Sequence, residues 1–403
     1  MEYFIIFIIF LILAVAFDYR RYTNNRKLYF NLECVILILL WGLRYRVGGD
    51  SLTYEEEFLY YPSLTEILKG GVKDLPFQPL WYIFNGIIKS ITPSFWFFQL
   101  VHAIIINTVV FSIINHYCKA KFTATLFYYV FISANMNAEI LREALSVCFF
   151  LIAFKYMIEN KLVKYYLLAI IAMSFHQSAI FLLILPIFKP FFISTWKLKH
   201  YIIISVVIIV LGIVAANAID YLIGINLLGN DFSNDKAIRY YAKAVASQDT
   251  NTGFGGSQFG IRFLLRIFLS LYVIFSIKRV KLNTPANNYV VHSYLLLTIM
   301  GFILGVIAGR WINYFVVLYY CIIAELLYVG ISSRNYMVKI RPLLIVFLYT
   351  VLFIFSYTSD SSNGYINSHN EFYRRYYPYH SIFNPQKEPD RENLRYYELY
   401  PNE

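Results

Sequence analysis

Charged and imidazole side chains stand at the ends of several long apolar runs in this sequence. They are Arg44, Arg46, Asp50, Arg142, His176 and Arg310. Ionisable groups at membrane depth are costly and usually functional. A planar guanidinium group binds phosphate oxygens two at a time. The arginines therefore predict a site that holds an anion, and the geometry of phosphate suits them.

Each of these residues also has a structural interpretation that the sequence leaves open. Arg44 and Arg46 could extend from a helix end to the membrane interface. Asp50 follows two glycines and could form a salt bridge or a turn.

The other three have comparable alternatives. Arg142 lies three residues after Glu139, so the two could form an ion pair on one helix face. His176 could be a hydrogen-bonded structural residue. Arg310 precedes Trp311 and could anchor a helix at the membrane interface.

The elements that would position these residues are membrane-spanning helices. Of the 403 residues, 59% are hydrophobic and 15% are charged, whereas roughly a quarter of a soluble domain is charged. The apolar runs are continuous and long enough to cross a bilayer as helices, which excludes a β-barrel. The sequence predicts an all-α polytopic membrane protein with twelve spans. They are residues 3–17, 28–43, 95–114, 122–137, 140–158, 164–176, 177–189, 201–219, 259–277, 286–308, 311–330 and 342–357.

Lysine and arginine residues determine the predicted orientation, because they mark the cytoplasmic loops of membrane proteins. Basic clusters follow every odd-numbered span, and these loops contain only two acidic residues, Asp18 and Glu159. Both chain ends are therefore predicted on the extracytoplasmic face. The polar residues named above fall at the outer ends of the spans.

Several segments are predicted outside the regular spans. Residues 44–78 and 220–258 form outer loops of a transmembrane domain, residues 1–357. Residues 358–403 form an aromatic-rich tail, which could be an interfacial belt or could stack on sugar rings. The segment 79–91 is predicted as an interfacial or re-entrant helix. The short spans 164–176 and 177–189 are predicted to be half-helices that meet near His176.

Other chemistries lack support in the sequence. The net charge is +11, but its placement in the predicted inner loops argues against a nucleic-acid partner. The histidines and cysteines show no metal-ligand spacing, so no metal and no cofactor are predicted. The acidic run at residues 55–57 is interpreted as a solvated face.

Two segments of the first hundred residues resemble those of a known family. The stretch GLRYRVGGDSLTY, Gly42 to Tyr54, resembles the signature of the EpsG family of Wzy-type polysaccharide polymerases. The stretch QPLWYIFN resembles a family segment that begins with Glu-Pro, and Gln78 stands here in place of the acid.

Three later segments extend this resemblance. The stretch ILREALSVCFF carries Arg142 before a small-residue helix, as in the family. The stretch AMSFHQSAIFLLILP matches a Phe-His-x-Ser-Ala pattern with His176 and Ser178. The stretch GRWINYF resembles an Arg-then-Tyr segment with Arg310 and Tyr314. The resemblance covers about residues 1–357, with the segments in the expected order.

The resemblance implies a metal-independent membrane glycosyltransferase with a GT-C-like bundle in the bacterial cytoplasmic membrane. Such an enzyme joins lipid-linked oligosaccharide repeat units on the outer leaflet. The donor is a growing chain on undecaprenyl diphosphate, and the acceptor is the next lipid-linked unit. Capsule, exopolysaccharide or O-antigen is the product. Membrane lipids, a chain-length regulator and a flippase are the further partners that it implies.

The resemblance and the residue chemistry together suggest roles for the polar residues. Arg142 and Arg310 would stabilise the charge that develops on the leaving diphosphate. His176 would be the general base, with Asp50 as the alternative. Substrate-binding roles are predicted for Arg44, Arg46, Tyr54, Tyr314 and Gln78.

Three other functions remain as alternatives. A lipid-linked oligosaccharide flippase predicts charged residues along a path through both leaflets, whereas the charges here gather on the outer side. An O-antigen ligase-like transferase shares the donor chemistry, so the sequence separates it poorly from a polymerase. A membrane scaffold without activity leaves the outward arginines unexplained.

Overall fold

The computed structural model describes residues 2–70, 78–197, 200–204, 206–207, 210, 257–304, 306–358, 372–389 and 391–392. The described chain is helical and contains no β-strand, only two isolated bridges. The predicted all-α class is therefore confirmed for these residues. The chain divides into two compact units. The first unit is Met1–Pro186 with Tyr320–Glu403, and the second unit is Ile187–Tyr319.

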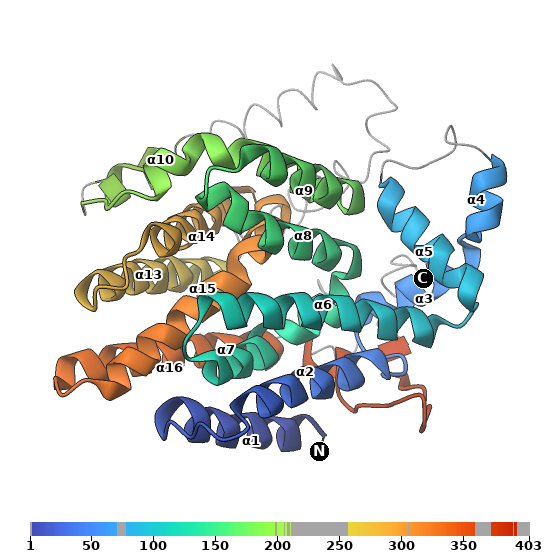
Figure 1. The fold of residues 1–403 in the computed structure, drawn as a ribbon, viewed down its shortest axis with the longest axis horizontal. Coiled ribbons are helices and arrows are strands. Elements are labelled where there is room, and N and C mark those ends of the chain that lie inside the picture. Colours follow the sequence, from blue (N-terminus) through green and yellow to red (C-terminus); the bar gives the residue numbers. More distant parts are fainter. Residues whose placement is uncertain are drawn as a thin grey trace. The chain divides into compact units, whose positions relative to one another are not determined.

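The first unit begins with helices that pack in pairs (Figure 1). The helices are α1 (Glu2–Ala14), η1 (Val15–Tyr19), α2 (Arg26–Gly42), α3 (Gly49–Tyr60), α4 (Leu64–Gly70), α5 (Pro79–Ile91), α6 (Phe95–Tyr117), α7 (Lys121–Tyr128), η3 (Tyr129–Ser133), η4 (Asn135–Glu139), α8 (Leu141–Ile158), α9 (Leu162–Phe175) and η5 (Gln177–Phe188). Helix α2 packs along α6, α1 packs along α7, and α8 forms an antiparallel pair with α9. Fully buried phenylalanines such as Phe98 and Phe150 fill the spaces between them.

The chain returns to the first unit at its C-terminal end. Helix α15 (Val306–Ser332) begins in the second unit and ends in the first. Helix α16 (Tyr336–Thr358) and the short η7 (Phe372–Arg375) follow it.

Four helices are long and apolar enough to cross a membrane: Glu2–Tyr19, Phe95–Tyr117, Gly309–Ser332 and Val338–Thr358. Only 22% of the first and of the last of these helices is buried inside the protein, as expected for lipid-facing helices. Every predicted span coincides with a helix except 201–219, which lies mostly outside the described residues. The count of twelve spans stays a prediction. The described residues also exclude most of the predicted loop 220–258, together with residues 359–371 and 393–403 of the predicted tail.

Residues 44–78, which the sequence suggested as a loop, contain two helices, α3 and α4. Helix α3 begins where the chain turns at Gly48, whose φ is +100°. A Cβ atom at Gly48 would lie 2.7 Å from the Cβ atom of Ala138, so glycine suits both the backbone angle and the space. The predicted helix at 79–91 is confirmed as α5, which begins with Pro79 at a favourable first position.

The Glu139 carboxylate receives the first two backbone N–H groups of α3. Gly49 N donates to Glu139 Oε1 at 2.9 Å, and Asp50 N donates to Oε2 at 3.1 Å. Arg375 approaches the same carboxylate at 3.4 Å. A negative charge at a helix N-terminus satisfies unpaired donors and favours the helix dipole. This contact attaches α3 to η4, which immediately precedes α8.

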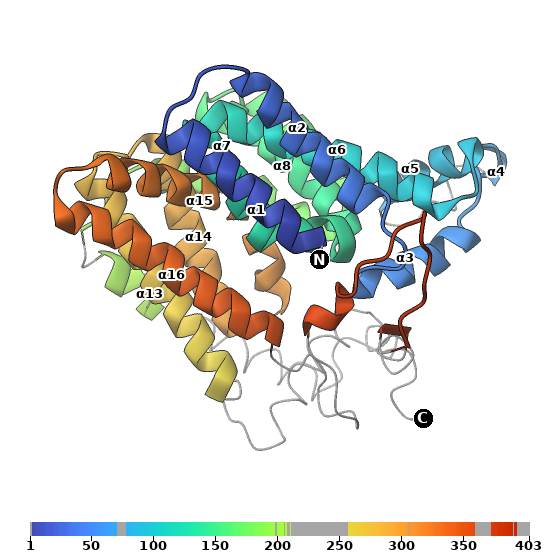
Figure 2. The ribbon, with the colours of Figure 1, turned by 90° about the horizontal axis from the view of Figure 1, so that it is seen from below.

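The described part of the C-terminal tail packs against the turn between α2 and α3 (Figure 2). The Arg46 guanidinium binds the Glu392 carboxylate in a bidentate pair, with distances of 2.5 and 2.6 Å. The Tyr379 hydroxyl donates to Leu40 O at 2.8 Å, and Tyr376 is buried. Neither the belt nor the sugar-stacking interpretation of the tail predicted these contacts.

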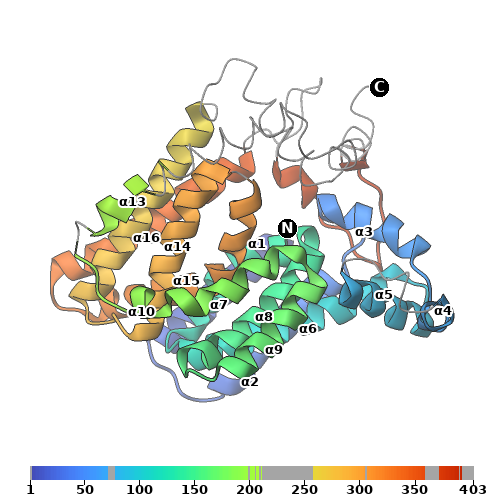
Figure 3. The same cartoon turned by 90° about the horizontal axis from the view of Figure 1, so that it is seen from above.

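The second unit contains α10 (Lys189–Phe192), α13 (Ser257–Arg279), α14 (Pro285–Leu304) and the first part of α15. Helices α13 and α14 form a hairpin (Figure 3). His292 on α14 stacks on Trp196 with ring centroids 4.2 Å apart. Its ring nitrogens contact Tyr201 Oη at 2.7 Å and Phe192 O at 2.6 Å. These contacts identify His292 as a structural residue of the unit.

The requirement for glycine at the turn between α2 and α3 can be tested by substitution. We expect Gly48→Ala to destabilise the protein by about 1–3 kcal/mol, because the new Cβ strains the backbone and meets Ala138. The matched control is Gly309→Ala, where the added Cβ has no neighbour within 4 Å. Thermal unfolding of the detergent-solubilised protein should show a lower midpoint for Gly48→Ala only. Equal midpoints for the two variants would contradict this description of the turn.

Candidate functional site

One face of α3 carries aromatic side chains that pack against α5. Tyr54 lies on α3, and Tyr61, seven positions later, is the residue that directly follows the helix on the same side. The Tyr54 and Trp81 rings meet edge to face, with centroids 5.6 Å apart. Trp81 Nε1 donates to Tyr61 Oη at 3.1 Å, and the Tyr61 and Tyr82 rings are 5.5 Å apart. We call this cluster the aromatic surface: Tyr54 and Trp81 are buried beneath it, and the half-buried rings of Tyr61 and Tyr82 are the ones that a sugar ring can reach.

Arg142, near the start of α8, faces this aromatic surface. Its guanidinium carbon lies 5.6 Å from the centroid of the Tyr54 ring, a cation–π distance. Tyr61 and Glu57 are also close enough to act on its charge. The arginine Nε is buried, and no group among the described residues accepts a hydrogen bond from it. Arg142 is therefore a half-buried cation with one donor available for a ligand.

The two tyrosines of the α3 face stay protonated at neutral pH. Burial raises the pKa of Tyr54 to about 12, and the nearby charge of Arg142 lowers it less than burial raises it. Burial also raises the pKa of Tyr61. Both phenol groups are therefore available as hydrogen-bond donors, which suits hydroxyl or phosphate oxygens as acceptors.

The acidic run that follows Tyr54 is not a uniformly solvated face, so that interpretation was wrong. Glu56 is exposed, but Glu55 accepts a hydrogen bond from Arg46 Nη1 at 2.6 Å. Glu57 is half-buried, and its Oε2 is a buried atom that no donor among the described residues reaches. Helical periodicity was the available signal, because Glu57 is three residues from Tyr54 and four from Tyr61.

His176 lies at the predicted break between two helices, which is confirmed. Its backbone is extended, with φ −150° and ψ 129°, after α9 ends at Phe175 and before η5 begins. The side chain is buried, and its Nδ1 lies 2.7 Å from Ser178 Oγ. Ser178 N donates to the same nitrogen at 3.2 Å. The neutral imidazole then carries its proton on Nε2.

The antiparallel pair of α8 and α9 places Arg142 and His176 at the same end of the first unit. Ser146, one turn after Arg142, donates to Ala172 O at 2.8 Å. Ala172 O also accepts the backbone N–H of His176 at 3.1 Å. Helix α5 reaches this end as well, because the Phe84 and Phe175 rings are 6.4 Å apart. The structure thus gathers α3, α5, the start of α8 and the end of α9 (Figure 1).

Arg44 and Arg46 do not extend into solvent. Arg44 is 0% exposed, and its guanidinium donates to Trp41 O and, at 3.2 Å, to Val47 O and Ser51 Oγ. These bonds hold the turn after α2, so a positioning role suits Arg44 better than a substrate contact. Arg46 is bound by the carboxylates of Glu392 in the tail and of Glu55 on α3.

Two further predicted site residues lie at the starts of helices. Asp50 is exposed in the first turn of α3, and its backbone N–H is bound by Glu139. Gln78 precedes the first residue of α5, and its Oε1 is buried without a hydrogen-bond donor among the described residues. Gln78 lies one turn before Trp81, close to the aromatic surface in sequence.

Arg310 and Tyr314 lie one turn apart on α15, in the second unit. Arg310 is half-buried and Tyr314 is fully buried. Their predicted convergence with Arg142 stays a prediction. Within the part of the chain that the structure describes, no group of His, Cys, Asp and Glu side chains has the arrangement of a metal site.

Comparison with known proteins gives one match. The model of the EpsG family matches residues 27–381, which is most of the chain. No curated protein and no solved structure matches.

Proposed function

The chain belongs to the EpsG family of Wzy-type polysaccharide polymerases, and from this premise we propose that it joins repeat units carried on undecaprenyl diphosphate. The transfer takes place on the outer face of the bacterial cytoplasmic membrane. The observation that carries this proposal is the half-buried Arg142 beside Tyr54, with an unpaired Nε, at a surface of tyrosine and tryptophan side chains. A cation beside aromatic rings suits a ligand that contains both a diphosphate and sugars.

In the proposed reaction, a hydroxyl of the acceptor sugar attacks the anomeric carbon of the donor. A new carbon–oxygen bond forms, and the bond from the anomeric carbon to the diphosphate oxygen breaks. Arg142, with Arg310 as its proposed partner, stabilises the charge that the departing diphosphate gains. The proton of the attacking hydroxyl passes to a general base. Tyr54 and Tyr314 are proposed to donate hydrogen bonds to sugar or phosphate oxygens.

Three residues are proposed as the general base. His176 and Asp50 were suggested by the sequence. The structure adds Glu57, a carboxylate whose buried Oε2 lies near the Arg142 charge. Because Ser178 N donates to His176 Nδ1, the imidazole is better arranged to donate from Nε2 than to accept a proton. We therefore favour Glu57 as the base and His176 as a donor to the substrate.

The proposal includes a GT-C-like bundle of twelve spans with both chain ends outside, a reaction that needs no metal ion, and a division into residues 1–357 and the tail 358–403. The four long apolar helices and the distribution of basic residues in the sequence support a multi-span protein. A chain-length regulator and a flippase are proposed as cellular partners.

The role of Arg142 can be tested with Arg142→Lys, which keeps the charge but removes the planar fork. We expect at least a hundredfold loss of long polymer, since one preorganised donor to a developing charge contributes roughly 10²–10³ in rate. Glycans from a deletion strain that expresses each variant would be sized on a gel, with membrane levels of the protein measured in parallel. The matched control is Arg279→Lys, which makes the same substitution at the last residue of α13. A normal ladder from Arg142→Lys would exclude Arg142 from the mechanism.

The role of Glu57 as the general base can be tested by comparison with its neighbour Glu56. Glu57→Gln should lower chain extension by the purified enzyme by roughly 10²-fold or more, because the proton acceptor is lost. Glu56→Gln changes the same charge at an exposed position and should retain wild-type activity. If both variants extend chains equally, the base is another group, and His176→Ala and Asp50→Asn become the next comparisons.

A further inference from the structure

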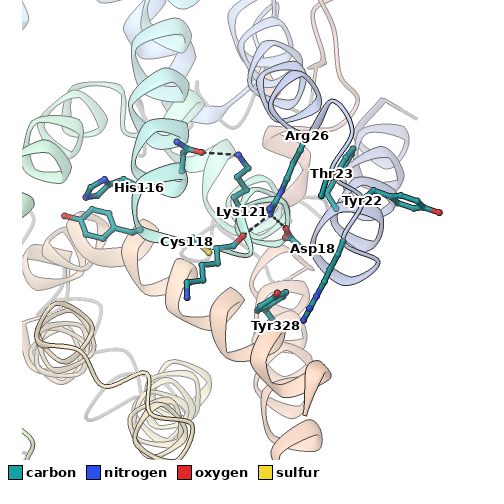
Figure 4. Close-up of a pocket in the computed structure, with 13 residues that line it drawn as sticks. Asp18, Tyr22, Thr23, Arg26, His116, Cys118, Lys121 and Tyr328 are labelled. Atoms are coloured by element: carbon teal, nitrogen blue, oxygen red, sulfur yellow. Dashed lines mark hydrogen bonds and ion pairs between the residues drawn. The ribbon is translucent and has the colours of Figure 1, made fainter. Parts of the chain in front are cut away.

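A cavity of about 610 Å³ lies in the first unit at the ends of α2 and α6 that are remote from the candidate site (Figure 4). It is lined by Phe17, Asp18, Arg21, Tyr22, Thr23, Arg26, Asn115, His116, Tyr117, Cys118, Lys119, Lys121 and Tyr328. These residues come from η1, the segment that joins η1 to α2, the first residue of α2, the end of α6, the segment that joins α6 to α7, the start of α7, and α15. We call this cavity the basic pocket.

The basic pocket and the candidate site are separated by the length of α6. Phe98, near the start of α6, packs on Trp81 of the site with ring centroids 5.5 Å apart, whereas Tyr117 at its end lines the pocket. A helix of 23 residues is about 34 Å long, close to the thickness of a hydrocarbon core. The pocket therefore belongs to the membrane face opposite the site.

Cations outnumber anions in the basic pocket. Arg21, Arg26, Lys119 and Lys121 line it, and Asp18 is the one acidic residue among its lining residues. Asp18 is 2% exposed and already satisfied, with Oδ1 bound by Arg26 and Oδ2 bound by the backbone and hydroxyl of Thr123. Among the lining residues, four positive charges thus face one negative charge, and the nearby Glu325 carboxylate accepts hydrogen bonds from the backbone N–H groups of Lys119 and Ala120.

Protein contacts hold several of these cations in place before any ligand binds. Arg26 Nη2 donates to Lys119 O at 3.1 Å as well as to Asp18, and Figure 4 shows Arg26 directed toward Asp18. Lys121 Nζ donates to Asn115 Oδ1 at 3.1 Å and lies 4.4 Å from the centroid of the Phe30 ring. The Arg26 Nε is buried and has no acceptor among the described residues. A preorganised cationic cavity with an unsatisfied donor favours an oxyanion ligand.

The surroundings of the basic pocket favour a ligand with apolar chains. Exposed apolar side chains continue from the pocket along α1 and α2, including Ile12 at 59% exposure and Leu28 at 63%. Tyr22 at the rim is 58% exposed. We propose that the basic pocket binds the phosphate of an anionic phospholipid, whose acyl chains lie along these helices. Basic residues on the cytoplasmic side are the ones that attract anionic lipids.

Native mass spectrometry of the full-length protein, released from nanodiscs of equal parts phosphatidylglycerol and phosphatidylcholine, tests this proposal. We expect phosphatidylglycerol to be retained at least tenfold over phosphatidylcholine. The double variant Arg21→Gln/Lys121→Gln should abolish this preference. The control Lys155→Gln/Lys161→Gln removes two exposed cations beside Glu159, in the loop between α8 and α9, and should preserve it. Unfolding midpoints of all variants would show that each remains folded.

The outcomes separate the sources of the phosphate group. Loss of the preference in the pocket variant alone supports the lipid site. Equal retention of both lipids by the wild type, or equal losses in pocket and control variants, overturns it. Inorganic phosphate at about 10 mM, an excess of roughly ten-thousandfold over a micromolar dissociation constant, serves as competitor. If the pocket binds this phosphate but retains no phosphatidylglycerol, its ligand is a soluble phosphate compound and the lipid proposal is wrong. None of these readouts depends on polymerase activity.

Discussion

The buried carboxylate of Glu139 is the contact on which the arrangement of the candidate site depends. It binds the first two N–H groups of α3, approaches Arg375 of the tail, and lies three residues before Arg142. Because α3 carries Tyr54, this one carboxylate fixes the tyrosine relative to the arginine that it faces. The close approach of Gly48 to Ala138 leaves no room for a side chain at the turn where α3 begins. The sequence suggested an ion pair between Glu139 and Arg142. In the structure, Glu139 instead binds the N-terminus of α3, and Arg142 faces Tyr54.

Local sequence patterns predicted the helices and the break between two of them, because these features depend on neighbouring residues. Long apolar runs indicated the helices, and the polar interruption at His176 indicated the break between α9 and η5. The site could be predicted only in part, because its geometry comes from contacts between distant residues. Gly49 and Glu139 are 90 positions apart, and Arg375 and Glu139 are 236 apart. Glu57 was missed since three consecutive glutamates look alike in sequence, whereas a helix turns each toward a different environment.

The two ends of the first unit use basic residues differently. Near the site, Arg44 and Arg46 form hydrogen bonds with carbonyl, hydroxyl and carboxylate groups of the protein. Arg142 is the arginine of this unit that faces the aromatic surface. In the basic pocket, four cations share one satisfied aspartate. The same helices, α2 and α6, connect both ends. An enzyme that handles a lipid diphosphate on one face while holding an anionic lipid on the other would be anchored in the bilayer at a defined depth.

We propose that a lipid diphosphate binds where Arg142 faces Tyr54. Photocrosslinking with an undecaprenyl diphosphate analogue that carries a diazirine next to the diphosphate tests it most directly. Peptide mapping should place the adducts on α3, on the start of α5 and on the first turns of α8, and Arg142→Lys should reduce them. Adducts on the basic pocket or on lipid-facing helices alone, unchanged in Arg142→Lys, would contradict the account.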